Sequence, residues 1–95
     1  MLVWVIYDIS ENRYRSRVAK TCKNYGLLRV QKSAFLGDLN RHEPDSLALE
    51  CVAIIDESDP VYVLPLCEDC FDKIKLIGAE FDRDLVSGMT ITKVF

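Results

Sequence analysis

The chain has 95 residues, of which 49% are hydrophobic, and it carries a net charge of −3 at pH 7. This length predicts a single domain over residues 1–95, and no apolar run approaches the ~20 residues that a membrane span requires. The N-terminal apolar run lacks a basic leader and a small-residue cleavage site. We therefore expect no signal peptide and no membrane contact, and we predict a cytoplasmic protein.

The first predicted element is a buried strand over residues 2–8, because this run is rich in Val, Ile, Trp and Tyr. Asp8 stands at its C-terminal end. Ser10 is a candidate N-cap for a helix over residues 11–25, and Gly26 suits the end of that helix. Apolar residues at spacings of four, four and three predict its buried stripe: Tyr14, Val18, Cys22 and Tyr25.

A second strand is predicted over residues 27–36, with Gly37 at its end. Side chains alternate between the two faces of a strand, so every second residue would share a face. One face would then carry a mixture that is unusual for a core and suits a binding surface: Arg29, Gln31, Ser33 and Phe35.

The second half of the chain predicts one helix and three strands. Pro44 suits the first turn of a helix that continues to Ile55. A strand follows over residues 61–66, and a short one over residues 73–77. The alternating, β-branched segment 89–95 predicts a last strand.

This order of elements predicts an α+β fold of the ferredoxin-like βαββαβ type. A four-stranded antiparallel sheet, with residues 73–77 as its fourth strand, would carry both helices on one face. The core would span residues 1–78. The last strand has no place in that sheet, so we expect residues 79–95 to pair across a homodimer and cover exposed strand edges.

Basic residues are distributed unevenly along the chain. Residues 11–32 hold seven bases against one acid, whereas residues 33–95 hold five bases against thirteen acids. Such asymmetry can create a basic face on an acidic protein, although an ordinary solvated helix face gives the same pattern. The seven bases are Arg13, Arg15, Arg17, Lys20, Lys23, Arg29 and Lys32.

Asp8 is the candidate metal ligand. Carboxylate oxygens bind magnesium or manganese, and arginines that follow in the sequence can hold phosphate. This combination suggests metal-assisted work on a nucleic-acid backbone. The alternative is an Asp that only ends a strand and helps to start a helix.

The four cysteines form two classes. Cys22 and Cys51 lie in apolar helical patterns and are expected to be buried. Cys67 and Cys70 form a Cys-x-x-Cys pair, for which zinc binding, a redox role or a plain pair of thiols in a turn all stay open.

Four segments together resemble the family of CRISPR-associated protein two. They are V-W-V-I-Y-D-I-S at 3–10, R-x-R-V-A-K at 15–20, Y-G-L-x-R-V-Q-K-S-A-F at 25–35 and Y-V-L-P-L-C-x-x-C at 62–70. The resemblance implies a homodimer of ferredoxin-like subunits. It also implies that Asp8 of each subunit approaches the two-fold axis and shares one divalent ion, magnesium or manganese.

The resemblance further implies a function. Family members are assigned metal-dependent cleavage of single-stranded RNA or double-stranded DNA, and the family forms a core of the spacer-integration complex. In that complex the dimer sits between two dimers of the integrase subunit, CRISPR-associated protein one, and duplex DNA lies across it. Six positions match those implicated in the family: Tyr7, Asp8, Arg15, Arg17, Arg29 and Phe35.

Physical chemistry assigns roles to these residues. Two neighbouring Asp8 carboxylates would repel each other unless a cation lay between them or one were protonated. The catalytic candidates are Asp8, Tyr7, Arg17, Arg29 and Ser33. The candidates for nucleic-acid binding are Arg13, Arg15, Arg17, Lys20, Arg29, Lys32 and Phe35, the last by stacking on a base.

Each of these roles has a structural alternative. Tyr7 and Phe35 suit a core, and the Ser33 hydroxyl suits a bond to backbone. Arg15 and Arg17 diverge by about 200° around a helix, so they are not expected to face one phosphate.

One carboxylate per subunit offers few metal ligands compared with the two-metal sites of many nucleases. Scaffolding of the integration complex is therefore the primary hypothesis, and nuclease activity is the secondary one. Two other functions stay open: a toxin-type RNA interferase resembling virulence-associated protein D, and a small regulatory domain that binds no nucleic acid.

Overall fold

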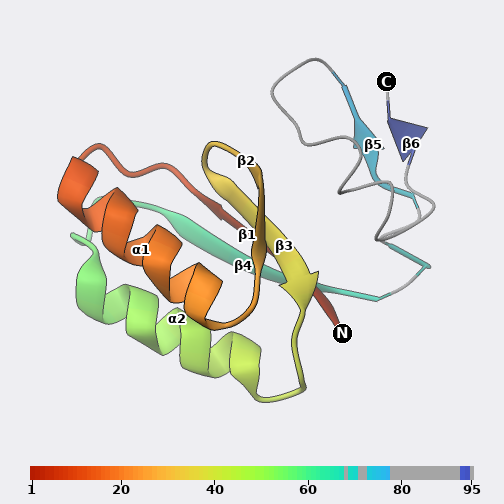
Figure 1. Ribbon diagram of the computed structural model, residues 1–95, viewed down its shortest axis with the longest axis horizontal. Coiled ribbons are helices and arrows are strands. Elements are labelled where there is room, and N and C mark those ends of the chain that lie inside the picture. The colour runs from red at the N-terminus through yellow and green to blue at the C-terminus, as the bar shows by residue number, and fades with distance from the viewer. Residues whose placement is uncertain (68, 71–72, 78–92, 95) are drawn as a thin grey trace.

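The computed structural model of the chain describes residues 1–67, 69–70, 73–77 and 93–94. Figure 1 labels the elements of these residues in chain order. They are β1 (Leu2–Tyr7), α1 (Asn12–Asn24), β2 (Leu28–Gln31), β3 (Ala34–Asp38), α2 (Glu43–Ile54), β4 (Val61–Leu66), β5 (Lys75–Leu76) and β6 (Lys93–Val94).

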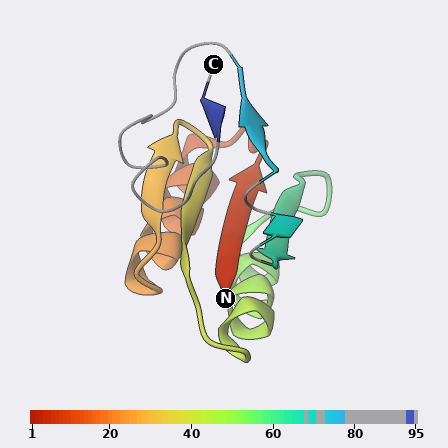
Figure 2. The same ribbon diagram turned by 90° about the vertical axis from the view of Figure 1, so that its right-hand side faces the viewer.

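The main sheet has four strands in the order β2-β3-β1-β4, with antiparallel pairing throughout. Both helices cover one face of this sheet (Figure 1), and Figure 2 views the molecule with the strands in front of the helices. Val5 of the central strand β1 pairs with Phe35 on one side and Val63 on the other. This arrangement confirms the predicted ferredoxin-like α+β fold.

The predicted strand over residues 27–36 is wrong, because these residues form a hairpin. β2 and β3 are separate strands, and Lys32 and Ser33 make the turn between them. The consecutive residues 34–36 are all buried, which requires a strand covered on both faces, and β3 meets this requirement beside β1. The hairpin thus supplies the fourth strand of the sheet, which had been assigned to residues 73–77.

Gly37 lies inside β3 and does not end it. A Cβ atom at this position would lie 2.8 Å from Leu27 Cδ2 and 3.2 Å from Leu27 Cα. The segment that leaves α1 therefore crosses β3 so closely that only glycine fits without a shift.

Helix α1 differs from the prediction at its start and agrees with it at its end. Glu11 is the N-cap residue, without a side-chain cap bond, so the assignment of Ser10 as the cap is wrong. At the other end Gly26 has φ +82°, and its N–H donates to the Lys23 carbonyl at 2.9 Å. The Leu27 N–H donates to the Cys22 carbonyl at 3.1 Å, which completes a Schellman motif.

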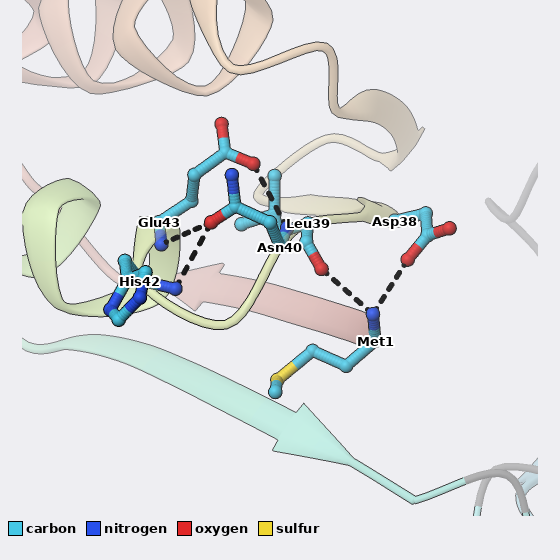
Figure 3. Close-up of polar contacts among 6 residues, drawn as sticks. All are labelled: Met1, Asp38, Leu39, Asn40, His42 and Glu43. Atoms are coloured by element: carbon cyan, nitrogen blue, oxygen red, sulfur yellow. Dashed lines mark hydrogen bonds and ion pairs between the residues drawn. The ribbon is translucent and has the colours of Figure 1, made fainter.

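Helix α2 begins with a reciprocal capping arrangement, drawn in Figure 3. The Asn40 side-chain oxygen accepts the N–H groups of His42 and Glu43 at 3.0 and 3.1 Å, and the Glu43 carboxylate accepts the Asn40 N–H at 2.9 Å. This is a capping box, which satisfies backbone groups that the helix cannot pair itself.

The segment that leads into this cap is held by the first residue of the chain. Figure 3 shows the Met1 amine donating to the Asp38 carboxylate at 2.8 Å and to the Leu39 carbonyl at 2.7 Å. The Leu39 N–H donates to the Met1 carbonyl at 2.8 Å. These bonds join the start of β1 to the end of β3.

The core lies on both faces of the sheet. The larger cluster, between sheet and helices, contains the odd-numbered residues of β1, Phe35, Leu47 and the two cysteines Cys22 and Cys51. Burial of both cysteines is as predicted, and of the predicted α1 stripe Val18 and Cys22 are buried while Tyr14 and Tyr25 are partly buried. A smaller cluster on the opposite side contains Trp4, Val30, Ala34 and Leu36, with Ile6, Leu66 and Ile74 packed against it.

We call the side of the sheet turned away from the helices the back face. On the strands β1 and β4 it carries Trp4, Ile6, Tyr62, Leu64 and Leu66. The side chains of Tyr62 and Leu64 are 55% and 40% exposed, so this apolar face is only partly covered in the single chain.

Beyond β4, the two short strands β5 and β6 pair in parallel and form a separate sheet, with Lys75 opposite Lys93. Most of the predicted strand 89–95 and of the dimer-crossing segment 79–95 lies outside the described residues, so that crossing stays a prediction. Neither described helix combines the length and hydrophobicity that a membrane crossing requires.

Candidate functional site

The C-terminal end of β1 is fixed by backbone bonds on both sides. The Tyr7 N–H donates to the Ser33 carbonyl at 3.0 Å, and the Asp8 N–H donates to the Pro60 carbonyl at 3.1 Å. Two neighbouring candidate residues are thereby held between the β2–β3 turn and the segment that enters β4.

Phe35 belongs to the core beneath this point and is 0% exposed. Its ring stacks on that of Tyr7, with centroids 6.4 Å apart and planes inclined by 23°. The Arg29 guanidinium carbon lies 5.0 Å from the Phe35 centroid, a cation–π distance. The prediction that Phe35 stacks on a base is therefore wrong, since the ring is enclosed and supports Tyr7 and Arg29 instead.

A hollow of about 260 Å³ lies between the first turns of α1 and the β2–β3 hairpin. We call it the cationic hollow. Its lining contains three cations, two serines, an amide and a phenol, and no acid: Arg15, Arg29, Lys32, Ser16, Ser33, Asn12 and Tyr7. Three positive charges around one space favour a multiply hydrogen-bonded anion such as a phosphate group.

The position of Arg15 in this lining follows from the periodicity of α1. At about 100° per residue, Arg15 lies on the same side of the helix as Val18 and Cys22, which are buried. Arg15 stands one turn nearer the N-terminus, where the core ends, so its side chain reaches the hollow. Its Nη2 donates to the Asn12 side-chain oxygen at 3.1 Å, which orients the guanidinium.

The remaining bases of α1 do not join the cationic hollow. Arg17 and Lys20 line a different hollow, toward α2, which also contains Glu50. The Glu50 carboxylate accepts a hydrogen bond from the Tyr25 hydroxyl, and this bond raises the pKa of Tyr25 to about 12. The predicted divergence of Arg15 and Arg17 is confirmed, because the two line different hollows.

Arg13 lies among acidic residues. Its Nε is 3.7 Å from the Glu11 carboxylate, and its guanidinium carbon lies 4.9 Å from the Tyr14 centroid. Asp56 and Asp59 line the same depression. The seven bases of residues 11–32 therefore do not form the single basic face that their clustering suggested.

Asp8 lies on the other side of the sheet from the cationic hollow. Tyr7 and Ile9 both pack in the helix-side core, so strand alternation directs Asp8 toward the back face, as it does Ile6. Asp8 is exposed and does not line the hollow. The single site predicted for the carboxylate and the arginines is therefore divided between two faces, and the alternation of Tyr7, Asp8 and Ile9 already indicates this division.

Asp8 is one exposed carboxylate, which suits a single ligand of a divalent cation and is not a complete metal site in one chain. Among the described residues, no three His, Cys, Asp or Glu side chains gather to hold a metal ion. Magnesium is usually bound through one or two carboxylates, with waters and substrate phosphates as its other ligands.

The model of the family described as CRISPR associated protein Cas2 matches residues 1–74. The chain belongs to this family. It is 42% identical over 71 residues to CRISPR-associated endoribonuclease Cas2 1 of Archaeoglobus fulgidus, a match that covers 74% of this chain and 76% of that protein. The resemblance read from the four sequence segments is thus confirmed.

Two further relatives of the Cas2 family bear on architecture and partners. The crystal structure of Streptococcus pyogenes Cas2 superposes with a TM-score of 0.69 at 28% identity, covering 82% of this chain and 100% of that one. A CRISPR-associated endonuclease Cas1/endonuclease Cas2 fusion of Thermoproteus tenax is 51% identical over 39 residues, or 41% of this chain and 15% of the fusion.

Proposed function

We propose that this Cas2 family member acts in CRISPR adaptation as a homodimer that binds duplex DNA together with Cas1. The observation that carries the proposal is the cationic hollow, where Arg15, Arg29 and Lys32 converge without an acid and apart from Asp8. Phosphate contacts of this kind position a duplex without reading its sequence, as capture of varied DNA segments requires. The Thermoproteus tenax fusion supports Cas1 as the partner, because it joins the two names in one protein.

The back face is the proposed dimer contact. Large apolar side chains remain exposed there, among them Tyr62 and Leu64, and such patches mark interaction surfaces. Asp8 lies on the same side of β1, so a two-fold contact through this face can bring two Asp8 carboxylates together. The cationic hollow opens on the helix side, and both copies of it stay free in such a dimer.

Endonuclease activity is the second candidate function, favoured by the name endoribonuclease that the Archaeoglobus fulgidus relative carries. The two Asp8 carboxylates of the dimer would hold magnesium or manganese. When bound, such an ion polarises a phosphoryl oxygen and activates water. Arg15, Arg29 and Lys32 would bind the backbone of single-stranded RNA or duplex DNA, and Tyr7 would keep the strand end rigid between the two surfaces.

The test is co-purification with Cas1 and capture of a short duplex DNA by wild type, Asp8→Ala and the double variant Arg15→Gln/Arg29→Gln. All three proteins should form the complex with Cas1. Asp8→Ala should capture duplex as the wild type does, and the double variant should lose capture. Arg13→Gln is the matched control, because Arg13 already pairs with Glu11 outside the hollow.

One outcome would reverse this assignment. If no complex forms with Cas1, while the purified dimer cleaves RNA or DNA only with magnesium and intact Asp8, the protein is an independent nuclease.

A further inference from the structure

Cys67 and Cys70 take no part in the sites described so far. Cys67 directly follows β4, and both thiols are exposed and free. The Cys70 N–H donates to the Cys67 sulfur at 3.3 Å. A backbone N–H directed at a sulfur atom stabilises its thiolate form, so the geometry makes the two cysteines chemically unequal.

The interaction between the two side chains acts in the same direction. A hydrogen bond from the Cys70 thiol lowers the pKa of Cys67, and its backbone N–H adds to this effect. The same side-chain bond, followed by repulsion from the Cys67 charge, raises the pKa of Cys70. The charge of Asp69 opposes the lowering of the Cys67 pKa, and the charge of Lys73 opposes the raising of the Cys70 pKa. The Cys67 sulfur is thus the better nucleophile, and the Cys70 backbone N–H lies within hydrogen-bond distance of it.

We propose that Cys67 and Cys70 are a redox-active dithiol that closes to an intramolecular disulfide by exchange with low-molecular-weight disulfides. In the first step the Cys67 thiolate attacks one sulfur of the small disulfide, forming a mixed disulfide and releasing one small thiolate. In the second step Cys70 loses its proton and attacks the Cys67 sulfur, releasing the second small thiolate. The protein dithiol is oxidised, and one small disulfide is reduced to two thiols.

The other two cysteines have the opposite properties. Cys22 and Cys51 are buried in the helix-side core, and burial raises the pKa of Cys22 to about 12. Neither is exposed to a solution disulfide. Zinc is the competing ligand for a Cys-x-x-Cys pair, but a structural zinc site needs four ligands, and no third candidate joins the pair among the described residues.

The pair occupies a position where closure has a structural consequence. Leu66 at the end of β4 and Ile74, which flank the pair in the sequence, both pack against the smaller cluster on the back face. A disulfide between Cys67 and Cys70 restricts the chain between those two contacts. Oxidation should therefore hold Ile74 on the cluster more firmly.

The experiment equilibrates the full-length native protein with graded ratios of reduced and oxidised glutathione, quenches with acid, and maps the thiols by alkylation and mass spectrometry. The expected result is loss of two hydrogen atoms from the segment that holds Cys67 and Cys70, while Cys22 and Cys51 stay reduced. Cys70→Ser should accumulate a mixed disulfide with glutathione on Cys67. With iodoacetamide, Cys67 in Cys70→Ser should still react at least about threefold faster than Cys70 in Cys67→Ser, because the backbone N–H of residue 70 remains to stabilise the Cys67 thiolate.

Three results would overturn the proposal: no disulfide even at the most oxidising ratio, equal alkylation rates of the two remaining thiols, or protection of both thiols by added zinc at stoichiometric concentration. The wild-type mapping needs no substitution, so a folding defect in either variant leaves the decision intact.

Discussion

The two faces of the sheet at the end of β1 differ in chemistry, although the residues that mark them, Tyr7 and Asp8, are neighbours in the sequence. On the helix side, Tyr7 borders a hollow with three cations and no acid, supported by the buried ring of Phe35. On the back face, Asp8 is exposed on the same side of β1 as Ile6, which pairs with Tyr62 of β4. Adjacent residues of a strand face opposite ways, so one sequence motif serves two surfaces.

This difference assigns separate tasks to the two surfaces. In our proposal the helix side binds an anion with side chains that belong to one subunit. The back face carries one carboxylate per chain, so in our proposal it becomes a metal site only when a second subunit covers it. Binding of nucleic acid and cleavage should accordingly respond to different substitutions.

Removal of the ring beneath the cationic hollow should have the largest effect. Phe35→Ala should lower the free energy of unfolding by about 3–5 kcal/mol, because it leaves a cavity in a fully enclosed site. That loss is a large part of the 5–15 kcal/mol typical of a domain. Urea denaturation followed by circular dichroism measures it.

The milder Phe35→Leu variant tests whether the ring also touches nucleic acid. The variant should stay folded and bind RNA or DNA within about twofold of wild type, whereas loss of a stacked base would cost about 1–3 kcal/mol of binding free energy. A loss of binding free energy of that size, at unchanged stability, would show that Phe35 contacts nucleic acid.

Asp8→Asn addresses the back face. Metal-dependent cleavage should fall by about 100-fold or more, because the amide cannot replace the carboxylate as a ligand. Thermal unfolding should not change, since the exposed side chain makes no bond within the described residues. Glu57→Gln, which changes an exposed acid elsewhere, is the control. Equal cleavage by Asp8→Asn and wild type would show that the back face takes no part in catalysis.

Single substitutions in the cationic hollow should have intermediate effects. Arg15→Gln and Arg29→Gln should each weaken duplex binding by about tenfold and reduce the salt dependence of binding by about one unit of log–log slope. Arg13→Gln should leave both quantities unchanged. Affinities for duplex DNA measured from 50 to 200 mM salt test this prediction. Equal losses of affinity in all three variants would show that only the general charge of α1 matters.

The last prediction concerns alkaline pH. Burial raises the pKa of Cys22 to about 12 from an ordinary value of 9.0, so the folded chain keeps a proton that the unfolded chain releases. This contribution to stability is complete below pH 9.0 and is lost as the pH rises toward about 12. Cys22→Ala should therefore show a shallower loss of stability over that range; an unchanged slope in urea titrations would contradict this cause.

Much of the fold follows from local pattern. The apolar run of β1 and the stripe of α1 predicted both elements within a few residues, because each buries one contiguous set of side chains. Local pattern does not predict the β2–β3 hairpin, because its turn residues Lys32 and Ser33 are neither glycine nor asparagine, the residues typical of a tight turn. Only the pairing of residues 34–38 with β1 shows that a second strand begins at Ala34.

The candidate residues can be named from the sequence, and their arrangement cannot. Asp8 is a candidate because of its chemistry and its place after β1, and the family resemblance adds Arg15 and Arg29. Their distribution over two faces depends on where the core lies, as does the burial of Phe35, and helix periodicity alone does not place Arg15 beside a hairpin that was not foreseen.

The most direct test of separate surfaces is to measure RNA and duplex DNA binding without divalent metal, and cleavage with magnesium, on the same preparations of Asp8→Asn and Arg15→Gln/Arg29→Gln. Asp8→Asn should bind within about twofold of wild type and fail to cleave, while the double variant should lose about 100-fold in affinity. If Asp8→Asn loses affinity as severely as the double variant does, the two faces act as one site and the account is wrong.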